Sequence, residues 1–118
     1  MNNLTLYYDE LEKILPTATT YIEPTFKFTG ENLAIEVKIG EDIQDLSYYE
    51  GITLVIRIVG IIEQQFDIIN KTFEIDKLVN NFKFSNLDRI VRENVYYSNY
   101  IDKDKFNTVL MYKIRNYK

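Results

Sequence analysis

The chain of 118 residues contains no cysteine and no histidine. Without cysteine it has no disulfides, no thiolate nucleophiles and no Cys-ligated metal sites. Without histidine it lacks the commonest general base at neutral pH and the commonest transition-metal ligand. Ser-His-Asp and Cys-His catalytic arrangements are therefore impossible within this chain. We predict that the protein is not an enzyme, and we expect neither a cofactor nor a metal ion.

Glycine and proline are also scarce, with four and two residues. The glycines form no P-loop, no G-x-G-x-x-G and no G-x-S-x-G motif, which argues against phosphate cradles and serine hydrolases. No apolar run is long enough to span a bilayer, and the first residues lack the features of a secretory signal. We therefore expect a cytoplasmic protein of a bacterial or host cell with no membrane partner.

Hydrophobic residues make up 46% of the chain, enough for one core, and we expect a single globular domain over residues 1–118. The most apolar stretch runs from Ile52 to Val59. Its residues alternate between an aliphatic face and a mixed face, which is typical of a strand packed on at least one side. This pattern predicts the central strand of an antiparallel sheet. The aliphatic face comprises Ile52, Leu54, Ile56 and Ile58.

Flanking segments are predicted to be neighbours of this strand or its cover. Apolar residues at helical spacing predict a helix over residues 2–15, which Pro16 ends. Alternation over Thr25–Ile39 around a short glycine-containing loop predicts a β-hairpin. The acidic stretch Gly40–Gly51 is predicted to be a loop or a short helical turn, and Phe106–Ile114 a final strand.

The segment Ile61–Ile69 fits both a strand and a helix, and its β-branched content favours a strand. Residues 73–95 are predicted to form two helices, because their apolar side chains recur three and four positions apart. Residues 102–105 are predicted to form a charged turn. Together these elements predict an α+β fold with an N-terminal helix, a four- to five-stranded mainly antiparallel sheet, and a helical pair before a C-terminal strand.

The charge is unevenly distributed along a chain of net charge −4. Residues 1–50 carry ten acidic and three basic side chains, whereas residues 51–118 carry eight acidic and eleven basic ones. An acidic first half can steer a partner that has a basic surface. The acidic loop lacks the central glycine and the alternating oxygen ligands of a calcium loop, so a solvated loop is the simpler interpretation.

Ten tyrosines provide the second functional signal, since tyrosine is enriched at binding hot spots. Two clusters stand out, one beside the acidic loop and one near residue 98, and the sequence leaves open whether each faces a partner or the core. The candidate binding residues are Glu41, Asp42, Asp45, Tyr48, Tyr49, Glu50, Tyr97 and Tyr100.

These observations predict a small acidic protein-binding domain without catalytic activity. Stoichiometric inhibitors, immunity proteins and anti-defence (for example anti-CRISPR-like) proteins of phages and mobile elements often have this size and composition. One alternative is a virion or complex assembly subunit that forms homo-oligomers. Another is a nucleic-acid-binding module that uses the basic C-terminal half, with Lys103, Lys105, Lys113, Arg115 and Lys118 interleaved with Tyr112 and Tyr117. The net negative charge argues against nucleic acid.

Overall fold

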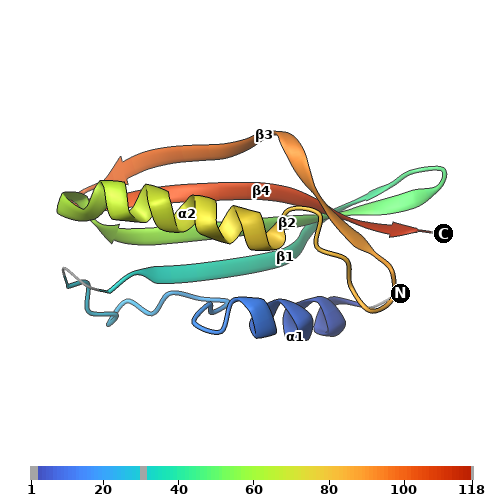
Figure 1. Ribbon diagram of the computed structural model, residues 1–118, viewed down its shortest axis with the longest axis horizontal. Coiled ribbons are helices and arrows are strands. Elements are labelled where there is room, and N and C mark those ends of the chain that lie inside the picture. The colour runs from blue at the N-terminus through green and yellow to red at the C-terminus, as the bar shows by residue number, and fades with distance from the viewer. Residues whose placement is uncertain (1–2, 30–31, 118) are drawn as a thin grey trace.

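The computed structural model describes residues 3–29 and 32–117, which form two helices, a short 3₁₀ turn and four strands (Figure 1). The four strands form one antiparallel sheet in the order β1-β2-β4-β3. The predicted α+β class, the N-terminal helix and the antiparallel sheet are thus confirmed. In chain order the elements are α1 (Leu4–Ile14), β1 (Ala34–Asp45), β2 (Tyr49–Ile61), η1 (Ile62–Gln64), α2 (Gln65–Val79), β3 (Arg89–Asp102) and β4 (Lys105–Tyr117).

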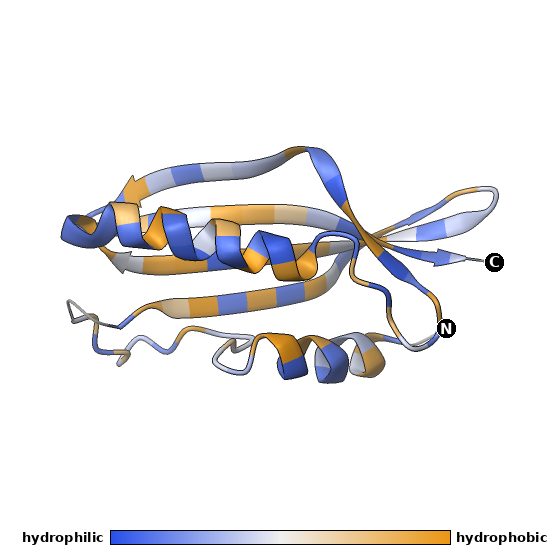
Figure 2. Cartoon of the chain, in the orientation of Figure 1, coloured by the Kyte–Doolittle hydropathy of each residue, from blue (hydrophilic) through white to orange (hydrophobic). Residues whose placement is uncertain are grey.

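The predicted central strand is β2, which pairs with β1 on one side and β4 on the other. All four side chains of its aliphatic face are fully buried in the core. The predicted final strand is β4, and its residues Leu110 and Ile114 lie beside this face and are also fully buried. Figure 2 shows alternating hydrophobic and hydrophilic bands along β1, the pattern expected of a strand with one buried face.

Helix α2 covers the core face of the sheet (Figure 1). Its buried residues Ile68, Ile75 and Val79 recur at helical spacing and join the same hydrophobic cluster as β2 and β4. On the opposite face, here called the open face, Thr53, Val55 and Arg57 of β2 remain partly exposed. The sheet therefore has one face built into the core and one that is partly accessible.

Helix α1 lies along the outer edge of β1 rather than across the sheet (Figure 1). It contributes Tyr7 and Leu11 to the core. The chain then continues along the same edge, where the amide of Thr19 donates to the carbonyl of Ile35 at 2.8 Å and the amide of Val37 donates to the carbonyl of Thr19 at 2.7 Å. These contacts cover part of an edge that would otherwise offer unpaired backbone groups to another chain.

The β-branched content of Ile61–Ile69 favoured a strand, but this segment is mostly helical. Ile61 ends β2, residues 62–64 form the 3₁₀ turn, and α2 begins at Gln65. Helical spacing prevails over β propensity because Ile68 starts the apolar stripe that α2 buries against the sheet. Residues 70–71, Asn-Lys, whose composition suits a turn, also lie within this helix.

The predicted hairpin at Thr25–Ile39 is also wrong. Residues 25–29 form no strand, although the ring centroids of Phe26 and Phe28 lie 4.7 Å apart. The loop expected at residues 30–31 lies outside the described residues. The hairpin partner of β1 is instead β2, which matches its alternating face over a longer register. The stretch Gly40–Gly51 is accordingly the end of this hairpin rather than a loop or helical turn.

The predicted pair of helices over residues 73–95 is one helix followed by a strand. Helix α2 ends at Val79, and β3 begins at Arg89 and includes the tyrosines at residues 96–100. Leu87 and Val95, two of the apolar residues within the predicted helical segment, are exposed. A β-bulge between Arg92 and Tyr97 breaks the strand alternation, and this break made the spacing resemble that of a helix. The charged turn over residues 102–105 is confirmed, with Lys103 and Asp104 between the two strands.

Buried polar groups join the helices to the sheet. The carboxylate of Asp76 on α2 accepts hydrogen bonds from Arg92 on β3 and from the Tyr112 hydroxyl at 2.6 Å. The hydroxyl of Tyr7 on α1 donates to Asp88 at 2.5 Å. No described side-chain nitrogen or oxygen that is buried lacks a hydrogen-bond partner. No helix among the described residues is long and apolar enough to cross a bilayer.

Candidate functional site: the tip of the β1–β2 hairpin

The acidic and tyrosine-rich stretch forms the tip of the hairpin between β1 and β2. A three-residue loop joins the strands, and the amide of Leu46 donates to the carbonyl of Tyr49 at 2.9 Å to close it. A bulge interrupts the pairing between Ile39 and Ile43. Gly40 adopts φ +85° there, a conformation that glycine enters at little cost. The bulge separates the buried part of β1 from the tip.

The tip projects from the body of the protein. In β1 the residues up to Ile39 are buried with one exception, whereas every residue from Glu41 to Asp45 is exposed. Figure 1 shows the loop between β1 and β2 extending beyond the ends of both helices. Tyr48, in the loop itself, is 82% exposed, more than any other large hydrophobic side chain that the structure describes. The six predicted residues from 41 to 50 therefore form one accessible surface.

Like charges face each other at this tip. Asp45 and Glu50 are directly opposite in the register of β1 and β2, a placement that is destabilising by a few tenths of a kcal/mol or more. Both lie on the face of the sheet that carries Ile52. Glu41 and Asp42, within the bulge, add two more exposed carboxylates. A local sacrifice of stability of this kind is typical of surfaces that serve binding.

The two adjacent tyrosines have different surroundings. The ring of Tyr49 lies 6.0 Å from the ring of Tyr117 on β4, and the guanidinium of Arg115 lies 5.0 Å above it. These contacts fix the orientation of Tyr49 on the open face. The neighbouring Tyr48 projects from the loop, so its ring is available to a partner.

Tyr97 and Tyr100 do not belong to this surface. Both lie on β3, opposite Leu110 and Asn107 of β4, whereas Glu50 at the tip is opposite Asn116. That offset of at least six residues corresponds to about 20 Å along the strands. Tyr97 stacks on Phe73 of α2, with ring centroids 5.0 Å apart, so it helps to hold the helix on the sheet. Tyr100 lies on the open face and is 44% exposed.

Sequence reasoning missed a basic cluster on the open face, defined here as Arg89, Lys113 and Arg115. Arg89 and Arg115 are directly opposite each other in the register of β3 and β4, and Lys113 lies two residues along on the same face. A hollow of about 240 Å³ adjoins this cluster where β3 bulges away from β4. Its lining comprises Gln44, Tyr49, Val91, Arg92, Glu93, Asn94, Lys113 and Arg115. The charges were visible in the sequence, but their common face depends on the strand order.

The C-terminal bases and tyrosines that were considered together are divided by the fold. Tyr112 is fully buried against α2, while Tyr117 is half exposed on the open face. Burial in the core, together with the nearby Asp76 carboxylate, raises the pKa of Tyr112 above its usual value. Lys103 occupies the turn between β3 and β4, and Lys118 lies outside the described residues.

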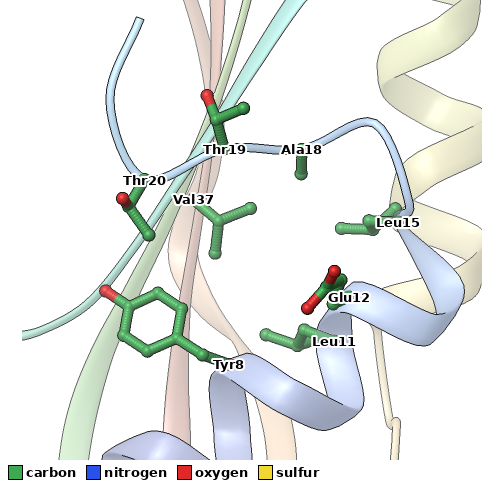
Figure 3. Close-up of a pocket in the computed structure, with 8 residues that line it drawn as sticks. All are labelled: Tyr8, Leu11, Glu12, Leu15, Ala18, Thr19, Thr20 and Val37. Atoms are coloured by element: carbon green, nitrogen blue, oxygen red, sulfur yellow. The ribbon is translucent and has the colours of Figure 1, made fainter.

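A second hollow of about 130 Å³ separates α1 from the chain segment that follows it (Figure 3). Its lining is mainly apolar, and Figure 3 shows Leu11, Leu15 and Val37 turned toward the space. Tyr8 is also part of this lining, but its hydroxyl accepts a hydrogen bond from the amide of Ile39 at 2.9 Å. Glu12 is the only carboxylate among the lining residues, so the hollow contains no acid–base pair.

The part of the chain that the structure describes, residues 3–29 and 32–117, contains no cluster of acidic side chains that could hold a metal ion. The sequence matches no protein-family model, and no curated protein aligns with it significantly. The candidate site therefore depends on the geometry of the hairpin tip and the open face alone.

Proposed function

We propose that the protein is a non-catalytic binding domain whose hairpin tip docks onto a basic surface of a protein partner. The observation that carries this proposal is the projecting tip, which is exposed from Glu41 to Asp45 and ends in the protruding ring of Tyr48. Carboxylates steer a basic partner toward the tip, and a tyrosine ring supplies contact area with few rotatable bonds. Phe66 and Leu78 are exposed too, but they lie on α2, whose exposed side chains include both acids (Asp67, Glu74) and lysines (Lys71, Lys77).

The form of action that we propose is stoichiometric occlusion. A partner surface rich in lysine and arginine is one that commonly holds a nucleic acid or another acidic ligand. A tip with four carboxylates, Glu41, Asp42, Asp45 and Glu50, resembles such a ligand in charge. Inhibitors, immunity proteins and anti-defence proteins of phages or mobile elements work in this way, and the acidic composition of the chain supports the same proposal.

The experiment compares two charge-reversal variants with equal net charge. In the tip variant Glu41, Asp42 and Asp45 are changed to Lys. In the control variant Glu63→Lys, Asp67→Lys and Glu74→Lys alter three exposed acids at and near α2. Proteins captured from cell extract by the wild type are purified, and the wild type and both variants are titrated against them at low salt.

The proposal predicts a one-to-one complex with a dissociation constant at least tenfold higher for the tip variant, and little change for the control. Tyr48→Ala should also weaken the complex by about tenfold, because an exposed tyrosine at a hot spot contributes 1–2 kcal/mol or more. Affinity that is unchanged in the tip variant, or equally reduced in the control, would remove the tip from consideration.

Self-association is the second candidate, and it is favoured by the position of β3 at the edge of the sheet, where residues 81–84 pair only with its first residues. This edge strand of 14 residues carries the exposed side chains Val95 and Ile101. Its bulge after Arg92 interrupts the edge and disfavours pairing with another chain. Light scattering after size exclusion separates the two candidates, since the chain mass is 14.1 kDa and an assembly subunit would give a multiple of it.

A further inference from the structure

The charges of this acidic protein are segregated by the sheet. By register and by the lining of the hollow, the open face carries six basic and three acidic side chains. The two acidic side chains that lie opposite each other at the hairpin tip, Asp45 and Glu50, project from the other face. The net negative charge of the whole chain therefore conceals one basic surface. The basic side chains are Lys38, Arg57, Arg89, Lys105, Lys113 and Arg115, and the acidic ones are Glu36, Glu93 and Asp102.

Two of these basic side chains form ion pairs within the part of the chain that the structure describes. Arg57 contacts Glu36 at 3.2 Å, and Lys105 contacts Asp104 at 2.7 Å. Within residues 3–29 and 32–117, no carboxylate forms an ion pair with any member of the basic cluster. Lys113 donates to the neutral side chain of Gln44 at 2.8 Å. The unneutralised charge is thus concentrated at the hollow beside β3.

The register makes this cluster costly for the free protein. Two arginines directly opposite each other on one face repel, just as Asp45 and Glu50 do at the hairpin tip. An anion held between the two guanidinium groups would remove the repulsion and form charge-assisted hydrogen bonds. Glu93 in the lining of the hollow opposes an anion at that side, so the anion is expected on the side of Arg115.

Aromatic side chains share this face with the bases. Tyr49 and Tyr117 lie beside the cluster, and Tyr117 is half exposed. Tyr100 lies on the same face opposite Asn107, about 26 Å farther along the strands. The exposed Met111 lies between the two ends. Basic side chains that bind phosphates at one end, together with aromatic rings along the face, are the combination that retains single-stranded nucleic acid.

We propose that the open face binds a single-stranded nucleic acid. The phosphates of the strand lie on the basic cluster, and its nucleobases stack against Tyr100 and Tyr117. An acidic polypeptide would satisfy the cations, but it would leave the exposed aromatic rings without stacking partners. The basic cluster lies on the opposite face from the tip carboxylates Asp45 and Glu50, although Tyr49 borders both surfaces. The inference therefore does not depend on the proposed protein partner.

The test measures fluorescence anisotropy of labelled twelve-nucleotide dT and rU strands, with the full chain at several salt concentrations. The affinity should fall as salt rises, with a logarithmic slope of about −2 for three phosphate contacts. The double variant Arg89→Gln/Arg115→Gln should reduce the magnitude of that slope by about 1.4, since two contacts are lost. Tyr100→Ala should weaken binding by about tenfold through lost stacking.

Matched controls make the result specific. Lys71→Gln/Lys77→Gln removes the same charge from exposed positions on α2. Its dissociation constant for the strands should stay within about twofold of the value expected from the change in net charge alone. The single variant Arg89→Gln, at an exposed side chain, serves if the double variant does not fold. Charge reversal at Glu41, Asp42 and Asp45 should not weaken strand binding, which separates this inference from the function proposed for the tip.

Three results would overturn the proposal. One is no retention of either strand at 50 mM salt, and another is an equal loss in the Arg89→Gln/Arg115→Gln and Lys71→Gln/Lys77→Gln variants. The third is that polyglutamate competes as well as unlabelled dT, which would assign the face to an acidic polypeptide instead.

Discussion

The hydroxyl of Tyr112, near the middle of β4, donates a 2.6 Å hydrogen bond to the buried carboxylate of Asp76 on α2. Arg92 on β3 donates to both oxygens of the same carboxylate, so three elements meet at this side chain. A buried charge is tolerated only where it is paired and hydrogen-bonded. The helix and two strands are therefore positioned by a polar contact as well as by the apolar core around it.

Replacing Asp76 by Ala should destabilise the protein by about 2–4 kcal/mol, because Arg92 and Tyr112 would lose the acceptor they share. Urea unfolding followed by circular dichroism measures the change in the free energy of unfolding. Glu74→Ala on the same helix is the control. This exposed residue pairs weakly with Lys71, at 4.0 Å, so the change in stability should be less than about 0.5 kcal/mol. Equal losses in the two variants would contradict the role given to Asp76.

The two buried tyrosines predict a loss of stability at high pH. Burial, reinforced by Asp88 and Asp76 respectively, raises the pKa of Tyr7 and of Tyr112. Above pH about 10 the unfolded chain releases these protons while the folded protein retains them. The free energy of unfolding should therefore fall there by up to about 1.4 kcal/mol per pH unit for each tyrosine, and be unaffected by them below pH about 9.

Urea unfolding between pH 8 and pH 11 tests this dependence. Tyr112→Phe removes one of the two titrating groups, so its slope above pH about 10 should be shallower than that of the wild type by up to about 1.4 kcal/mol per pH unit. Tyr48→Phe, which changes a solvent-exposed ring, is the matched control and should keep the wild-type slope. A slope unchanged by Tyr112→Phe would show that this hydroxyl ionises equally in the folded and unfolded states.

The contact between Glu10 and Ser85 predicts a lowered pKa for Glu10. The carboxylate of Glu10 on α1 accepts from the Ser85 hydroxyl at 2.5 Å and from its amide at 2.9 Å, and these bonds lower the pKa of Glu10. Stability from this contact is present above the unfolded pKa of about 4.3 and is lost as pH falls through the folded value. NMR titration should find the Glu10 pKa below 4.3 and closer to it in Ser85→Ala. An unshifted value in the wild type would mean that α1 does not hold this loop in solution.

Two glycines in the hairpin should respond differently to alanine. Gly40 has φ +85°, and a Cβ there would lie 3.0 Å from the Leu4 side chain on α1. Gly40→Ala should therefore cost about 1–2 kcal/mol of unfolding free energy. Gly51 has no positive φ, and its Cβ would meet only the movable Lys113 side chain at 3.0 Å, so Gly51→Ala should cost less. Chemical denaturation of the two variants decides, and a larger loss at Gly51 would contradict the strain assigned to Gly40.

Much of the sheet could be predicted from local patterns because its central strands alternate without interruption. Ile52 to Ile58 repeat at period two, so β2 was identified with the correct buried face, and the same period over Phe106–Ile114 identified β4 as a strand. The edge strand β3 was missed because its bulge breaks the period, and α2 was shortened because isoleucine favours strands. Ser85 and Asp88 have the three-residue spacing of a helix capping box, but in the structure their side chains bond to Glu10 and Tyr7 of α1.

The candidate site could be predicted where its residues are neighbours in sequence. Glu41 to Glu50 lie together because a hairpin returns its two strands to the same place. Tyr97 and Tyr100, three residues apart on a strand, project to opposite faces, so they could not form one cluster. In the basic cluster, Arg89 is 24 and 26 positions from Lys113 and Arg115, and their common face depends on the register in which β3 pairs with β4. The bulge in β3 interrupts its alternation, so that register could not be predicted from a local pattern.

Glu50→Lys offers a test in which stability and binding should change in opposite directions. Lysine opposite Asp45 would convert a repulsive pair into an attractive one and should raise the free energy of unfolding by about 0.5 kcal/mol. The same change reverses one charge of the surface proposed to meet a basic partner, so affinity for the captured partner should fall about tenfold. Urea unfolding and titration on one preparation provide both values. A variant that is more stable and binds equally well would mean that the tip carboxylates play no part in recognition, whereas one that loses both properties would mean that Glu50 is needed to form the hairpin.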